Sequence, residues 1–322
     1  MNFSLIVNGA GNAFLREFGC PCSRCADREN RATTSVSVVA RDDHNGKILW
    51  HALVDAGPGV VESLVNALPP EEARLDWLLL SHWHPDHTLD LNRLCETARR
   101  TSRRRGQNFA RIPTWCREGT GKWLQKNYSY EWYRCLDPRV AGESHPPGVL
   151  MDPVPTGIPA IRITPFSVSH VGADLNPENF KEPLSCSASF VIETPRKKAV
   201  LLWDLDNRND WILKPASDDQ RKAVEKISSP HLLFIDCFAW TVEEMHGFNM
   251  GHLSFMTVRK YAKVLKPRET FLVHMSGHEE GEGNPGWGWT NERWEEEARK
   301  VWKSENLPGG VNIPRIGNEI SL

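Results

Sequence analysis

The sequence lacks both a long apolar stretch and a marked net charge, and each absence narrows the range of functions. No apolar run approaches the roughly 20 residues that a helix needs to cross a bilayer, so we expect no membrane partner. Lysine and arginine together number 39 and aspartate and glutamate 41, which gives a formal net charge of −2. Because nucleic-acid binding usually requires a strong positive charge, nucleic acid is not an expected partner.

The first residues, "MNFSLIVNGAGNAF", lack the basic segment and the long apolar core of a secretory signal peptide. We therefore expect a cytoplasmic protein, in which disulfides are rare. The close thiols of "FGCPCSRCADRE", Cys20, Cys22 and Cys25, are then candidate metal ligands, and a tetrahedral site needs a fourth ligand. The remaining cysteines are scattered and are expected to be buried apolar side chains: Cys95, Cys116, Cys135, Cys186 and Cys237.

The order of the predicted elements indicates an α/β fold. Strands come in runs in the first part of the chain, with a hairpin turn predicted at Asn45-Gly46, and later strands alternate with helices. This order predicts layers of helix, sheet, sheet and helix in a single domain over residues 1–322. The pattern is irregular from about 101 to 159, apart from a helical turn in "GKWLQKNY". We expect an insertion or a lid there.

A cluster of nitrogen and oxygen ligands follows the apolar strand "LDWLLLSH". The motif "SHWHPDH" supplies His82, His84, Asp86 and His87 within six residues. Loops that follow buried strands present functional groups from a rigid base. Imidazole and carboxylate together suit zinc, iron or manganese, so we expect a metal site here.

The motif His-x-His-x-Asp-His resembles the signature of the metallo-β-lactamase superfamily. The resemblance implies a four-layer αββα sandwich and further ligands in chain order, each after an apolar strand. These are His170 after "FSVS", Asp204 in "AVLLWDLD" and His274 in "ETFLVHMSGH". It implies two divalent metals, zinc or manganese with iron as a further candidate. One would be held by His82, His84 and His170 and the other by Asp86, His87 and His274, with Asp204 bridging.

The spacing Cys-x-Cys-x-x-Cys before such a domain resembles the PhnP family of cyclic phosphodiesterases from the carbon–phosphorus lyase pathway. The resemblance implies a structural zinc held by the three thiols and a histidine. The candidate is His278, four residues after His274 and one residue further than the family spacing. It also implies that His252, in "GHLSF", lies near the scissile phosphate, where it would act as the general acid. His246 is a weaker candidate for that role.

Two metal ions can share an activated water and neutralise charge on a phosphoryl group. The expected activity is therefore hydrolysis of a small cyclic or nucleotide-like phosphodiester, with Asp86 and His252 as catalytic residues. Asp55, in "VDAG", is expected to orient ligand histidines.

Several alternatives stay open. The enzyme could hydrolyse a lactone or a thioester, because this fold hosts many functions. The chain could instead be a non-catalytic binding protein similar to PQQ-biosynthesis protein B, or a tRNA 3′-end nuclease, although no glycine-rich arm is visible. The arginines between Arg99 and Arg111 either form a solvated face or attract a nucleotide or a nucleic acid. A homodimer is a further open expectation.

Overall fold

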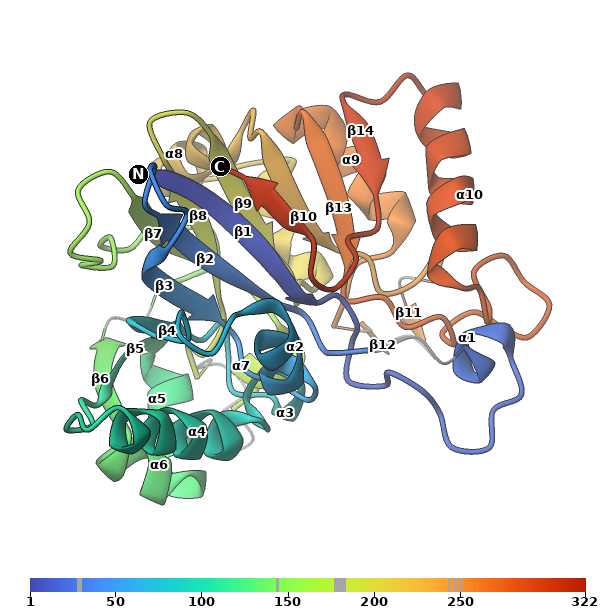
Figure 1. Cartoon of the computed structure of the whole chain (residues 1–322). Helices are drawn as coiled ribbons and strands as arrows, with labels where there is room; N and C mark the ends of the chain where they lie inside the picture. The colour runs from blue at the N-terminus through green and yellow to red at the C-terminus, as the bar shows by residue number, and fades with distance from the viewer. Residues whose placement is uncertain (28–30, 143–144, 177–183, 243, 246–247, 250) are drawn as a thin grey trace.

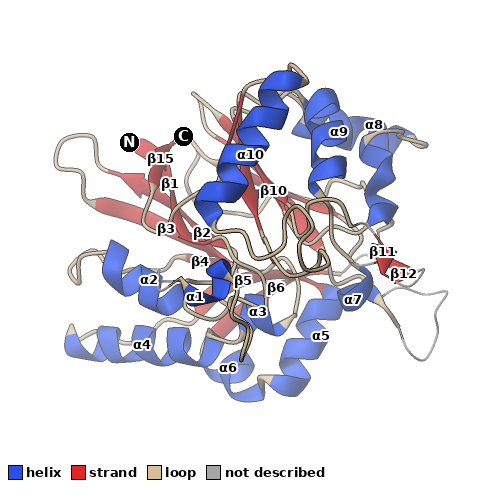
Figure 2. Cartoon of the chain, turned by 90° about the vertical axis from the view of Figure 1, so that its right-hand side faces the viewer, coloured by secondary structure: helices blue, strands red, loops and turns tan. Residues whose placement is uncertain are grey.

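Two β-sheets lie face to face in the molecule, and helices cover their outer faces, as Figure 1 and Figure 2 show. The computed structural model describes residues 1–322 except 28–30, 143–144, 177–183, 243, 246–247 and 250. His246 therefore lies outside the described residues. The arrangement confirms the predicted α/β fold and its four-layer αββα order.

The first sheet has the strand order β15-β1-β2-β3-β4-β5-β6. The predicted turn at Asn45-Gly46 is confirmed, since β2 and β3 pair antiparallel around it and Gly46 has a φ of 71°. From β3 to β6 the pairing is parallel. The strands are β1 (Asn2–Gly9), β2 (Ser35–Arg41), β3 (Ile48–Val54), β4 (Trp77–Leu79), β5 (Ile112–Arg117), β6 (Leu136–Ala141) and β15 (Glu319–Ser321).

Helices cover the outer face of this sheet because their apolar sides pack on β3 and β4. Leu53 and Leu78 from the sheet share a buried cluster with Val60, Leu94 and Leu124 from the helices. The helices in this half of the chain are α1 (Ser23–Ala26), α2 (Val60–Ala67), α3 (Pro85–Thr88), α4 (Leu91–Arg104), α5 (Glu118–Asn127) and α6 (Ser129–Arg134).

The second sheet has the order β14-β13-β10-β9-β8-β7, and β9, β10, β13 and β14 run parallel. Its strands are β7 (Arg162–Ser167), β8 (Ala188–Glu193), β9 (Lys198–Leu202), β10 (Leu232–Asp236), β13 (Glu269–Val273) and β14 (Gly310–Asn312). Two short strands, β11 (Glu244–Met245) and β12 (Phe248–Asn249), form a separate pair. Parallel strands end at the same edge of a sheet, so the residues that follow β9, β10 and β13 lie close together.

The outer helices of the second sheet begin at side-chain caps. Ser217, Ser254 and Thr290 each accept a hydrogen bond from the amide three residues further on, which satisfies an otherwise unpaired donor. The helices are α7 (Val171–Asp174), the 3₁₀ helix η1 (Asn207–Ile212), α8 (Asp218–Ile227), α9 (Phe255–Leu265) and α10 (Asn291–Ser304).

The two sheets share one apolar core. Alternate side chains of each strand face inward, so that Leu5 and Val38 of the first sheet meet Phe190 and Leu201 of the second in one buried cluster. This shared core holds the ends of the strands of both sheets in fixed positions.

The expectation of an irregular segment from 101 to 159 is wrong for residues 112–141, except that α5 confirms the helical turn predicted in "GKWLQKNY". There, β5, α5, α6 and β6 extend the first sheet, and β6 forms its edge. Trp123 of α5 stacks on Trp83 of the histidine motif, with ring centroids 4.8 Å apart. That part of this segment acts as a lid stays a prediction. In the part of the chain that the structure describes, no helix is long and apolar enough to cross a membrane.

Candidate metal centre

The candidate ligands of the histidine–aspartate centre come from strand ends of both sheets. We use this name for His82, His84, Asp86, His87, His170, Asp204 and His274. The first four follow β4 of one sheet, and the others follow β7, β9 and β13 of the other. The apolar strands before them are almost entirely buried, so the rigid core determines where the ligands lie.

The structure brings all seven residues together in two adjoining groups. The ligand atoms of His82, His84 and His170 lie within 4.8 Å of one another, as do those of Asp86, His87, Asp204 and His274. Asp204 lies between the groups. Its Oδ1 is 3.3 Å from His274 Nε2, 3.9 Å from His82 Nε2 and 3.8 Å from His170 Nε2. This position suits a bridging carboxylate, and the assignment of metals to these residues stays a prediction.

Hydrogen bonds determine which nitrogen of each histidine offers its lone pair to the centre. His170 Nδ1 donates to the carbonyl oxygen of Gly251 at 2.8 Å. His82 Nδ1 lies 3.0 Å from Ser81 Oγ, which itself donates to Asp55. An imidazole that donates through Nδ1 keeps a lone pair on Nε2. The Nε2 atoms of both residues therefore face the centre as acceptors or metal ligands.

Asp55 orients the histidine motif from behind, as the sequence predicted. Its Oδ2 accepts hydrogen bonds from His87 Nδ1 at 2.8 Å, Ser81 Oγ at 2.7 Å and Trp203 Nε1 at 3.0 Å. Its Oδ1 accepts from the Ser81 amide at 2.8 Å. Such a carboxylate behind a ligating histidine fixes the ring orientation and raises its basicity.

Unpaired buried atoms show that the centre fits metal ions. His82 Nε2 is buried and has no hydrogen-bond partner among the described residues. His87 Nε2 and Asp204 Oδ2 are also buried, and they face each other at 3.1 Å as an ion pair without forming a hydrogen bond. Polar atoms buried without a partner cost free energy, and ligation of a cation would satisfy all three. Imidazole and carboxylate donors in this number suit zinc, manganese or iron.

The charges of the centre also favour a cation. Burial lowers the pKa of His82 and of His170, so both are neutral and free to ligate. Burial would lower the pKa of His87 and His274 as well. Nearby carboxylates, chiefly that of Asp204, outweigh it, so the pKa of His87 lies well above its usual value and that of His274 rises to about 9. In the metal-free protein, protons therefore occupy the nitrogens where metal ions would bind.

Backbone strain gathers at the same place. Asp55, Asp204 and His274 have φ angles of 63°, 57° and 61°, in the left-handed region that residues with a side chain seldom adopt. Each follows directly or closely after a strand. Strained residues of this kind persist where the surrounding structure over-determines them, and they cluster at functional sites.

His252, the predicted general acid, lies beside the centre. Its ring centroid is 4.7 Å from that of His274 and 4.9 Å from that of His170, and the ring also stacks on Phe238 at 4.3 Å. Its Nδ1 lies 3.1 Å from Asp236 Oδ2. The side chain is 14% exposed, so His252 can reach a molecule bound at the centre.

Sequence reasoning missed Asp236. This buried residue ends β10, between the strands that carry Asp204 and His274, and also accepts a hydrogen bond from the Leu205 amide. The available signal was its position at the end of the apolar strand "HLLFID". His252 and Asp236 also form alternative ligand groups with members of the centre, so metal analysis of variants must separate the roles.

The cysteine cluster, Cys20, Cys22, Cys25 and His278, forms a second and separate donor set. His278 Nε2 lies 3.2 Å from Cys22 Sγ, 3.3 Å from Cys25 Sγ and 3.6 Å from Cys20 Sγ. The cysteines are free thiols, and all four ligand atoms lie within 4.8 Å of one another. Three thiolates and one imidazole form a closed tetrahedral set that fits structural zinc, so the structure brings together the residues named for this role.

Two further residues support the cysteine cluster, and the sequence did not indicate either. Glu17 Oε1 lies 3.3 Å from His278 Nδ1, on the side of the ring away from the thiols. Arg24, between Cys22 and Cys25, donates to the carbonyl oxygens of Met275 and Trp289. Burial and the nearby Arg31 lower the pKa of Arg24 to about 10, whereas the cysteine side chains act in the opposite direction.

Comparisons with known proteins agree with this architecture. Residues 51–275 match the family model described as the beta-lactamase superfamily domain. No curated protein sequence matches the chain. Among solved structures, the metallo-beta-lactamase fold protein YhfI from Bacillus subtilis is 18% identical, with 100% of both chains covered and a TM-score of 0.65.

Two other solved structures are similar over almost the whole length. A diphosphatase from the PhnP family is 18% identical, with 100% of this chain and 98% of that chain covered and a TM-score of 0.64. Zinc-bound PqqB from Methylobacterium extorquens is 15% identical, with 99% and 100% covered and a TM-score of 0.67. At these identities the likeness concerns the fold alone.

Proposed function

Because the chain belongs to the beta-lactamase superfamily, we propose that it is a metal-dependent hydrolase that cleaves a small cyclic or nucleotide-like phosphodiester. The observation that carries the proposal is the position of Asp204 between two groups of buried, partly unpaired ligand atoms. Such a donor set would hold two metal ions. When bound, two divalent cations activate a water molecule as nucleophile and neutralise charge on the phosphoryl group.

The residues of the chain have separate roles as metal ligands and as positioning groups. His82, His84 and His170 would hold one ion, Asp86, His87 and His274 would hold the other, and Asp204 would contact both. Asp55 keeps the ring of His87 in place through the 2.8 Å bond to Nδ1. These contacts fix the charges and dipoles of the site before substrate binds. Such preorganised electrostatics account for much of the rate enhancement of many enzymes.

His252 would supply the proton for the leaving oxygen. Its Nδ1 faces Asp236 at 3.1 Å, which leaves Nε2 as the atom that can carry a transferable proton. Asp236 orients the ring through this contact. The ring packs against His170 and His274, so the proton is held beside the place where the scissile bond would lie.

Two observations favour a phosphodiester over a lactone or a thioester. The cysteine cluster is complete, as in the family of cyclic phosphodiesterases that the N-terminal motif resembles. A structure described as a diphosphatase from the PhnP family is similar in fold over the whole chain. The likeness to PqqB supports the second candidate, a protein that binds a small molecule without turnover.

Activity on matched substrates tests the proposal. The protein loaded with Mn²⁺ or Zn²⁺ should hydrolyse bis(p-nitrophenyl) phosphate faster than p-nitrophenyl phosphate, because the monoester carries an additional negative charge that no further cation meets. A chelator should abolish the activity and added metal should restore it. Metal-loaded protein that opens only a lactone or a thioester would contradict the proposal. Protein that turns over nothing but binds a small molecule tightly would favour the PqqB-like alternative.

A further inference from the structure

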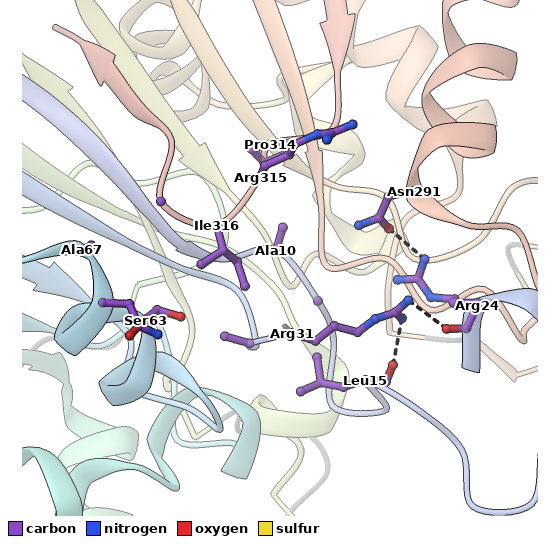
Figure 3. Close-up of a pocket in the computed structure, with 14 residues that line it drawn as sticks. Ala10, Leu15, Arg24, Arg31, Ser63, Ala67, Asn291, Pro314, Arg315 and Ile316 are labelled. Carbon is purple, nitrogen blue, oxygen red and sulfur yellow. Dashed lines mark hydrogen bonds between the residues drawn. The ribbon is translucent and has the colours of Figure 1, made fainter. Parts of the chain in front are cut away.

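A cavity of about 530 Å³ lies apart from the histidine–aspartate centre (Figure 3). Five parts of the chain meet around it: Ala10 and Gly11 after β1, the four residues Leu15, Arg24, Arg31 and Ala32, helix α2, the first residue of α10 and the segment 314–317. None of the candidate metal ligands lines it. The volume falls within the range of small-molecule sites, roughly 300–1,000 Å³.

The charged groups that line the cavity are all positive. They are Arg24, Arg31 and Arg315, and no aspartate or glutamate is among the lining residues that the structure describes. Arg315 is 68% exposed and its nearest carboxylate is that of Glu292, at 3.6 Å. A concave surface with one sign of charge focuses its field on ligands of the opposite sign.

Two of the arginines are held rigidly beside one another, and Figure 3 shows both side chains at the same end of the cavity. Arg24 is 3% exposed and donates to Met275 O, Trp289 O and Asn291 Oδ1. Arg31 donates to Leu15 O and Arg24 O. Because their positions are fixed, little conformational entropy would be lost when they bind an anion.

The two arginines are not fully satisfied by the described residues. Arg31 has one carboxylate partner, Asp27, and Arg24 has none within 4.0 Å in the described part of the chain. The Nε atoms of both are buried and lack a hydrogen-bond partner among these residues. A buried donor without a partner is unfavourable, and no carboxylate of the described residues forms an ion pair with Arg24 that would offset its charge.

We infer that this cavity binds a small molecule through an oxyanion group, a phosphate or a carboxylate. Arginine is the side chain best suited to both groups, because its planar fork matches their oxygens. Ser63, Asn66 and Asn291 add neutral polar groups, and Leu15 and Ile316 give the apolar contact that a ligand larger than a bare ion needs.

The test separates this cavity from the metal centre, which also attracts oxyanions. Pyrophosphate and citrate are titrated calorimetrically into the metal-loaded full chain and into Asp204→Ala, which removes the bridging carboxylate and leaves the cavity intact. At least one of the two anions should still bind Asp204→Ala with one site per chain. Binding of pyrophosphate alone would assign a phosphate group, and binding of citrate alone a carboxylate. Absence of binding by both would overturn the inference.

Variants at Asn66 test whether the anion binds in the cavity. The Asn66 side chain is exposed in α2 and makes no hydrogen bond with any described residue, so its replacement does not disturb the fold. Asn66→Asp should weaken binding about 10-fold through like-charge repulsion, with Asn66→Ala as the uncharged control. Arg100→Gln, at a 73% exposed residue outside the cavity, should leave binding unchanged. Equal affinities in Asn66→Asp and Asn66→Ala would overturn the inference.

Discussion

The histidine–aspartate centre and the cysteine cluster are both candidate donor sets for metal ions, but they differ in how the chain builds them. The centre lies at the ends of strands from both sheets, and His82, His87, Asp204 and His274 are at most 2% exposed. The cysteine cluster joins a four-residue helix, α1, to a loop more than 250 residues later in the chain, and Cys20 and Cys25 are partly exposed.

This difference indicates different tasks. The centre has seven donors in two groups, and His252 lies at its side. This arrangement suits two metals that keep open positions for water and substrate. The cluster has four donors, enough to close one tetrahedral site. We therefore expect the centre to determine activity and the cluster to determine stability. Each substitution below alters at most one of these two sites.

The largest effect is expected for Asp204→Ala. The carboxylate contacts both ligand groups, so its loss should release metal from the centre and abolish phosphodiester hydrolysis. Elemental analysis should show that the cluster zinc is retained. Unchanged metal content in the centre would show that Asp204 does not bridge.

His252→Ala should slow turnover by about 10²–10⁴-fold, the range typical of a lost general acid, while the metal content stays the same. The loss should shrink for a diester whose leaving group needs no proton. Equal losses for good and poor leaving groups would remove His252 from the acid role. Loss of metal in this variant would make His252 a ligand instead.

The sequence predicted the centre well because its signal is local. Four of its residues lie within six positions, and the other three each follow an apolar strand. Asp236 and Glu17 were missed because their partners, His252 and His278, come close only through folding. The strands at 112–117 and 136–141 were missed because both are short and contain proline. Pro138 is tolerated in β6 because this strand lies at the edge of the sheet.

Cys22→Ser should remove about one zinc per chain and leave the ions of the centre in place. Because a closed zinc site contributes directly to folding stability, the melting temperature should fall by several degrees, as a loss of a few kcal/mol would cause. Cys116→Ser is the matched control, since Cys116 is buried outside the cluster. An unchanged zinc content in Cys22→Ser would refute the assignment.

The smallest effect concerns pH. The pKa of His274 is about 9 and that of His87 lies well above its usual value, so both carry protons in the metal-free centre at neutral pH. Metal must displace these protons. Its apparent affinity should therefore rise by at least about 10-fold per pH unit up to about pH 9. Calorimetry in buffers of different ionisation enthalpy would detect the released protons. An affinity that does not change between pH 6 and pH 8 would contradict the charge distribution described here.

The most direct test of the two-site account is a crystal of the metal-loaded protein measured at the zinc absorption edge. The account predicts three anomalous peaks. Two should lie on either side of the Asp204 carboxylate, and one should lie within the cysteine cluster, enclosed by Cys20, Cys22, Cys25 and His278. A single peak at the centre, or a peak at the centre held by Asp236 and His252 in place of Asp204, would contradict the dinuclear assignment. Absence of a peak between the three thiols would contradict the structural zinc.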